Sequence, residues 1–118
     1  MRIDDSTADL ICIQFTNEER NGVIASLKSL SRNSGDVCVV HGENGRVVFQ
    51  IVEHGFKIDC SEVTNICIEL PQKECNDLMD AIQEHVDEAS EWSLDHSFES
   101  LGADISPKHI SDVVIETI

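Results

Sequence analysis

The stretch from Pro71 to Trp92 has the clearest hydrophobic pattern in the chain, because its apolar residues recur every three or four positions. On an α-helix, which turns by about 100° per residue, such residues gather on one side. The pattern therefore predicts a helix, and Pro71 suits its first turn because proline has no amide to leave unpaired. The apolar side of this predicted helix consists of Cys75, Leu78, Met79, Ile82, Val86 and Ala89.

Carboxylates occupy the opposite side of the predicted helix. Surface helices usually mix Glu with Lys, which gives favourable pairs four residues apart. Here Lys73 is the only Lys or Arg, so the acidic side repels itself. Its carboxylates span about 26 Å, or about one charge per 4 Å, which resembles a single DNA strand more than a duplex. They belong to Glu74, Asp77, Asp80, Glu84, Asp87, Glu88 and Glu91.

The N-terminal part of the chain predicts a strand followed by a helix. Residues 1–8 are polar and are expected to be frayed, whereas residues 9–15 alternate between apolar and polar positions and predict a strand. Thr16 and Glu19 match a capping box, which predicts that a helix begins here. We expect this helix to end at residues 33–35 and to bury Val23, Ile24, Leu27 and Leu30.

The middle of the chain predicts a β-hairpin and then further strands. Residues 36–40 and 46–52 are β-branched runs, and Asn44-Gly45 between them tolerates the positive φ angles of tight turns. Gly55 permits another reversal. After it, residues 56–60 and 65–70 predict one broken strand or two short ones, in which Ile66, Ile68 and Leu70 face the same way.

The C-terminal part is open to two interpretations. Residues 93–102 are expected to form a loop or a short helix. Ser106-Pro107 is a suitable start for a last helix, which would bury Ile110, Val113, Val114 and Thr117. Residues 113–118 fit an edge strand equally well.

Taken in order, these elements predict an α+β fold in a single domain, residues 1–118. The expected arrangement is β-α-β-β-β-α plus a C-terminal helix or strand. Its sheet is expected to be mainly antiparallel, with the helices packed on one face.

Charge narrows the range of partners. The chain has 23 acidic residues against 8 basic ones and a formal net charge of -15, so a nucleic-acid backbone or an anionic membrane would repel it. No apolar stretch is long enough to span a bilayer, and the N-terminus lacks the pattern of a signal peptide. We therefore expect a cytoplasmic protein whose five cysteines are reduced.

Metal and catalytic motifs are weak in this sequence. Cys38 and His41 would point to opposite faces of a strand, and the five histidines show no metal-ligand spacing, so no metal or other cofactor is expected. A Cys-His nucleophilic pair stays open, because such partners meet in space and not in sequence. An enzyme is nevertheless the less favoured class.

The acidic helix carries the functional hypothesis. It predicts a small binding or inhibitor protein that neutralises a basic partner, such as an immunity protein for a toxic nuclease or an inhibitor that occupies a nucleic-acid-binding site. One alternative is a homo-oligomeric subunit, such as a homodimer, whose charge serves only solubility. Trp92 is either a core residue or an interface anchor. The predicted partner-binding residues are Asp77, Asp80, Glu84, Asp87, Glu88, Glu91 and Asp95.

Overall fold

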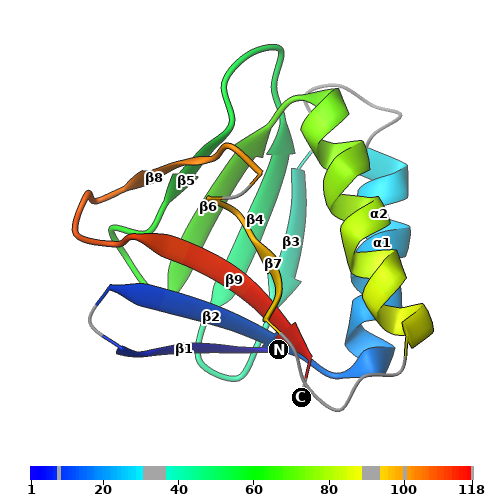
Figure 1. Ribbon diagram of the computed structural model, residues 1–118, viewed down its shortest axis with the longest axis horizontal. Helices are drawn as coiled ribbons and strands as arrows, with labels where there is room; N and C mark the ends of the chain where they lie inside the picture. Colours follow the sequence, from blue (N-terminus) through cyan, green and yellow to red (C-terminus); the bar gives the residue numbers. More distant parts are fainter. Residues whose placement is uncertain (8, 31–36, 89–93, 100, 118) are drawn as a thin grey trace.

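The computed structural model describes residues 1–7, 9–30, 37–88, 94–99 and 101–117. These residues form two helices and nine strands, in a body of 34 × 33 × 25 Å (Figure 1). In chain order the elements are β1 (Arg2–Thr7), β2 (Leu10–Phe15), α1 (Asn17–Leu30), β3 (Val37–His41), β4 (Arg46–Ile51), β5 (Lys57–Asp59), β6 (Asn65–Leu70), α2 (Gln72–Glu88), β7 (Leu94–Ser97), β8 (Asp104–Ser106) and β9 (Asp112–Thr117).

The described strands form two sheets. Sheet A has the order β1-β2-β9-β7, and sheet B has the order β3-β4-β6-β5-β8. Both are mixed, because β2–β9, β4–β6 and β5–β8 are parallel pairs and the other neighbours are antiparallel. The predicted α+β class is confirmed, with two sheets in place of one.

Alternation along the strands builds the core between the two sheets. In β6 the buried residues are Ile66, Ile68 and Leu70, which confirms the prediction that they share a face. Buried residues of sheet A and both helices belong to the same cluster. Phe56, just before β5, packs edge-on against Phe98, just after β7, with ring centroids 6.1 Å apart, so an aromatic pair also links the two sheets.

The two helices lie side by side and close one side of the molecule (Figure 1). Helix α1 begins with the predicted capping box: the Glu19 amide donates to Thr16 Oγ1 over 3.2 Å, and the Thr16 amide donates to Glu19 Oε1 over 3.0 Å. Its predicted end at residues 33–35 lies outside the described residues. Neither described helix combines the length and apolar character needed to cross a membrane. As predicted, α1 buries Val23, Ile24, Leu27 and Leu30.

The prediction that residues 1–8 are frayed is wrong, because Arg2–Thr7 forms β1 and pairs antiparallel with β2. The side chains of this strand are mostly polar and show no strand pattern in the sequence. Main-chain hydrogen bonds are the main link between β1 and the sheet. Met1 and Ile3 are its buried anchors. The Asn44 side chain pairs with the Ile3 backbone as another strand would, accepting from its amide over 2.9 Å and donating to its carbonyl over 2.6 Å.

The predicted β3–β4 hairpin is confirmed, but its glycines serve a different purpose from the one expected. Gly45 does not adopt a positive φ angle, which among the described glycines occurs at Gly55 and Gly102. A Cβ on Gly42 would lie 2.3 Å from the Met1 carbonyl oxygen, and one on Gly45 would lie 2.9 Å from Ile3 Cδ1. Both glycines therefore let β1 cross the turn closely.

The predicted C-terminal helix is wrong, and so is the loop or short helix expected at residues 93–102, where Leu94–Ser97 forms β7. Ser106 ends strand β8, and residues 112–117 form strand β9. The strand alternative was right, but β9 lies between β2 and β7 and not at an edge. A central strand can be apolar on both faces, and Val113, Val114 and Ile115 are all buried.

Candidate functional site

Helix α2 has one buried side and one exposed side. The Pro71 carbonyl accepts the first helical hydrogen bond, from the Cys75 amide over 2.9 Å. Cys75, Leu78 and Ile82 then recur at helical spacing and are at most 1% exposed. Because this stripe faces the core, residues midway between its members must face solvent.

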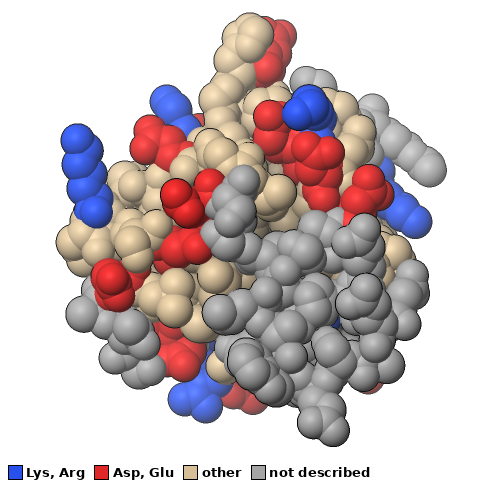
Figure 2. Space-filling view, viewed as in Figure 1, with Lys and Arg blue, Asp and Glu red and all other residues tan. Residues whose placement is uncertain are grey.

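The structure places two of the predicted partner-binding residues on this exposed side. Asp77 and Asp80 are both exposed, and Figure 2 shows acidic side chains gathered over the upper part of α2. The backbone positions of Glu84, Asp87 and Glu88 lie in the last turns of α2, and Asp95 lies in β7. The side chains of these four residues, all of Glu91 and all of Trp92 lie outside the described residues.

Little in the described part of α2 neutralises these carboxylates. The salt bridge seen there joins Lys73 Nζ to Asp77 Oδ2 over 3.8 Å, between side chains that are 83% and 50% exposed. Such exposed pairs contribute between about 0 and 1 kcal/mol, so Lys73 is held weakly and a partner can displace it from Asp77. Negative potential therefore extends outward from the first half of α2.

A buried arginine links helix α1 to helix α2. Arg20 is 1% exposed, and its Nη2 donates to the Ile82 carbonyl of α2 over 2.8 Å. A charge-assisted bond to a carbonyl in the helix interior fixes how the two helices pack. The sequence reasoning did not identify this contact. The signal was present, because Arg20 precedes Val23 by three residues and Ile24 by four, which places it on the buried stripe of α1.

The described residues offer no metal centre, since no group of three or more His, Cys, Asp or Glu is arranged to hold an ion. All five cysteines are free thiols. Burial raises the pKa of Cys60 and of Cys75 to about 11, with smaller contributions from Asp59 and Cys38 respectively. Burial also raises the pKa of Cys38, against a hydrogen bond to Ser26. These three thiols stay protonated near neutral pH and are weak nucleophiles.

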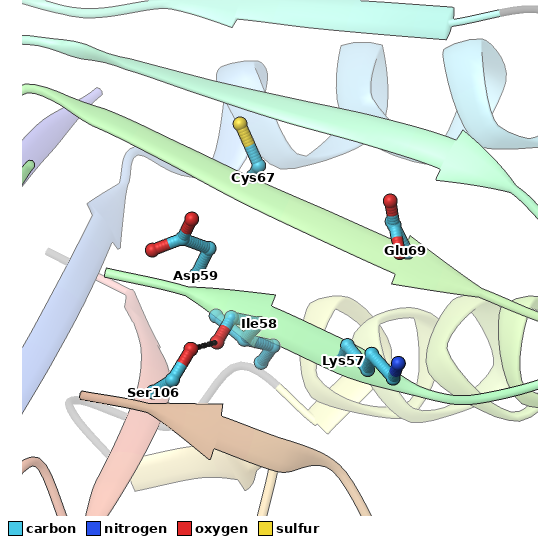
Figure 3. Close-up of a pocket in the computed structure, with 6 residues that line it drawn as sticks. All are labelled: Lys57, Ile58, Asp59, Cys67, Glu69 and Ser106. Carbon is cyan, nitrogen blue, oxygen red and sulfur yellow. Dashed lines mark hydrogen bonds between the residues drawn. The ribbon is translucent and has the colours of Figure 1, made fainter. Parts of the chain in front are cut away.

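The outer face of sheet B, which points away from the core, carries a hollow of about 400 Å³ (Figure 3). Asp59, Cys67 and Glu69 line it, with Ser106 at the β8 side, where its hydroxyl donates to the Ile58 carbonyl over 3.4 Å. Hydrogen bonds from Ser61 lower the pKa of Asp59, so this carboxylate stays charged. The sequence reasoning placed no site here, and Lys57 is the basic residue among those that line the hollow.

Comparison with known proteins adds no family to these observations. No protein family, curated protein or solved structure matches the chain. Function must therefore be argued from the two surfaces described above, the acidic side of α2 and the outer face of sheet B.

Proposed function

We propose that this chain is a small acidic binding protein that neutralises a basic protein partner in the cytoplasm. The partner class is a protein with a cationic nucleic-acid-binding surface, such as a toxic nuclease, and the chain acts as its immunity protein or inhibitor. The outward side of α2 occupies that surface and keeps nucleic acid from it.

The observation that supports this proposal is the exposure of Asp77 and Asp80 on a helix whose opposite side is fully buried. A helix fixed in this way presents its carboxylates as a rigid row, with positions 77, 80, 84 and 87 along one side. At about 1.5 Å per residue, neighbouring positions in this row are about 5 Å apart along the axis. Phosphates of one DNA strand are spaced by about 3.4 Å. A groove that binds phosphates therefore meets charges of the same sign at a comparable density.

The formal net charge of -15 supports the same partner class. Opposite net charges steer two proteins together and raise association rates to about 10⁸–10⁹ M⁻¹s⁻¹ at low salt. The advantage shrinks as salt shortens the Debye length to about 8 Å at physiological ionic strength. Association with the partner should therefore slow steeply as salt is added.

The test replaces Asp80, Glu84 and Asp87 by Lys. The partner is first recovered from the source cells on tagged wild-type protein, identified and purified, and association is then followed by stopped-flow fluorescence at low and moderate salt. We expect association at least about tenfold slower, because an attractive row of charges becomes repulsive. Folding of the variant is checked by circular dichroism.

A matched control separates this face from net charge alone. Replacing Asp5, Glu43 and Glu53 by Lys changes the formal charge by the same amount, at exposed positions outside α2. This control should associate much faster than the α2 variant. A folded α2 variant that associates as fast as the control would show that the acidic side of α2 has no role beyond solvation.

One observation favours the homo-oligomeric alternative as well. Val37 and Val39 lie on the edge strand β3 and are 55% and 39% exposed, more than the other large apolar residues that the structure describes. The two functions are compatible, because these valines lie on the outer face of sheet B, and Figure 3 shows the helices behind that sheet.

A further inference from the structure

Two rows of side chains cross the outer face of sheet B, because neighbouring strands are in register and alternate residues share a face. Taken in strand order from β3 to β8, the first row is Val37, Gln50, Glu69, Lys57 and Asp104. The second row, two residues along each strand, is Val39, Val48, Cys67, Asp59 and Ser106.

In these two rows the β3 and β4 half is mainly apolar, with Gln50 as its polar residue, and His41 and Arg46 lie beyond the second row. Val37 and Val39 are 55% and 39% exposed on β3, and Val48 and Cys67 beside them on β4 and β6 are half-buried. β-Branched side chains in this position bury their surface only if something covers the sheet. The core clusters on the other face of sheet B, so these valines contribute nothing to it.

The other half of the face carries charges of both signs that do not pair within the chain. Lys57 stands directly opposite Glu69 in the register, yet none of the salt bridges between described residues involves Lys57, Asp59 or Glu69. In Figure 3 the Lys57 side chain lies at one end of the hollow and the Asp59 side chain at the other. Both ions are exposed and available to a second molecule.

We infer that the outer face of sheet B is the interface of a symmetric dimer, whose occupant is a second copy of this chain. A two-fold axis in the plane of contact, running across the strands and between the two rows, lays each row over the opposite row of the second copy. Val37 then covers the second copy's Val39, and Lys57 reaches the second copy's Asp59. Each contact occurs twice.

Charge complementarity selects this occupant and this axis. Most of a chain with a formal charge of -15 repels its own copy, but β3 and β4 carry no carboxylate. On the charged half, Lys57 lies between Glu69 of its own chain and Asp59 of the second copy, and Asp104 lies on the edge strand β8. An axis running along the strands would instead lay Val37 and Val39 over the charged half, where ions would be buried without partners.

The size of the face predicts a weak, reversible dimer. The five strands are three to six residues long and together have 23 residues. At about 3.4 Å per residue and about 4.8 Å between strands, they cover roughly 370 Å² in projection. Stable interfaces bury about 800 Å² of accessible surface per partner, and a corrugated face exceeds its projected area. The dimer should therefore form in the micromolar range.

Sedimentation velocity over about 1–200 µM protein, at about 50 and 500 mM NaCl, tests the interface. We expect a monomer–dimer equilibrium that is at least as tight at the higher salt, because screening relieves repulsion between the two acidic chains. Val39→Lys, at an exposed position, should weaken it at least about tenfold.

A charge exchange tests the predicted axis. Lys57→Asp and Asp59→Lys should each weaken the dimer at least about tenfold, whereas the double variant recreates both ion pairs with the wild-type net charge and should restore it. Asp59→Lys makes the chain less acidic, so general repulsion predicts the opposite result. Circular dichroism checks that each variant is folded.

Three outcomes would overturn the inference: a monomer throughout the concentration range at both salts, a dimer indifferent to Val39→Lys, or a double variant no tighter than the single ones. The inference does not depend on the proposed function. The α2 variant with Lys at positions 80, 84 and 87 should dimerise at least as well as wild type, even though it associates more slowly with the basic partner.

Discussion

Two glycines in the β3–β4 turn leave the space that the N-terminal strand needs in order to dock. Gly42 and Gly45 leave room for Met1 and Ile3, and the Glu43 amide donates to the Met1 carbonyl over 2.8 Å. The turn thereby becomes the place where β1 of sheet A meets sheet B. Any Cβ at position 42 must displace backbone, which cannot move as a flexible side chain would.

At the residue scale we therefore predict opposite effects for two glycine substitutions. Gly42→Ala should lower the free energy of unfolding by at least about 1 kcal/mol, because the new Cβ meets the Met1 carbonyl oxygen. Gly22→Ala should raise it by about 0.5–1 kcal/mol, because Gly22 lies within α1 and a Cβ there meets nothing within 4 Å. Urea unfolding measures both. A Gly42→Ala variant as stable as wild type would show that β1 does not sit against the turn.

At the scale of elements, Glu19 ties the start of α1 to the beginning of the chain. One of its oxygens accepts the Thr16 amide in the capping box, and the other is paired with the Met1 amino group. The bond to the amino group is the main cause that lowers the pKa of Glu19, and the Thr16 amide adds to it. A carboxyl whose pKa is lowered by folding stabilises the fold above its ordinary pKa, and this contribution is lost as pH falls through the lowered value.

We predict that Glu19→Gln destabilises the chain by about 0.5–1 kcal/mol at pH 7 and by progressively less below about pH 4.5. Glutamine can still cap the helix but carries no charge for the amino group. Urea unfolding between pH 7 and pH 3 measures the difference from wild type. Glu18→Gln, at the exposed neighbouring position, is the control and should show a smaller effect. A Glu19→Gln difference that is constant over this range would contradict the pairing.

The elements that could be predicted from the sequence are those whose signal is local. Three features were predicted from residues close together in the sequence. They are the Thr16–Glu19 capping box, the β3–β4 hairpin and the buried and exposed sides of α2. Strand β1 was missed because its side chains are mostly polar, although its main-chain partner β2 follows it directly in the sequence. Near the C-terminus, Ile110, Val113, Val114 and Thr117 have helical spacing by coincidence, since Val113 and Val114 are buried on opposite faces of the central strand β9.

The candidate site was predictable only in part, for a similar reason. The exposure of Asp77 and Asp80 follows from the position of the apolar stripe within α2, so sequence periodicity is enough. The outer face of sheet B combines residues of five strands that are up to 69 positions apart, from Val37 to Ser106. Periodicity within one strand cannot tell which of its two faces will be covered, and β3 was expected only as part of a hairpin.

At the scale of the whole molecule, acidic charge works against folding. With 23 acidic and 8 basic residues, the compact state brings like charges together. The ion pairs seen between described residues join Met1 to Glu19 and Lys73 to Asp77. Self-repulsion of this kind is the energetic cost of so acidic a surface. Salt should relieve it, since exposed charges beyond a Debye length are screened.

We predict that the thermal midpoint of unfolding, measured by circular dichroism at low protein concentration, rises by roughly 2–5 °C between about 10 and 300 mM NaCl. Asp80 and Glu53 are both exposed. Replacing both by Lys adds two charge units per substitution, so the formal charge changes from -15 to -11. This variant should respond less to salt than wild type. An equal response in the two proteins would mean that repulsion between surface carboxylates does not limit stability.

The place of β9 between β2 and β7 has a consequence for biosynthesis. Strand β2 comes from residues 10–15 and its parallel partner β9 from residues 112–117, so nearly the whole described chain separates two neighbours in sheet A. While residues 112–117 are still inside the ribosomal tunnel, one side of β2 and one side of β7 have no strand to pair with. Sheet A therefore assembles only after translation has passed these residues, whereas the β3–β4–β6 part of sheet B can form earlier on the emerging chain.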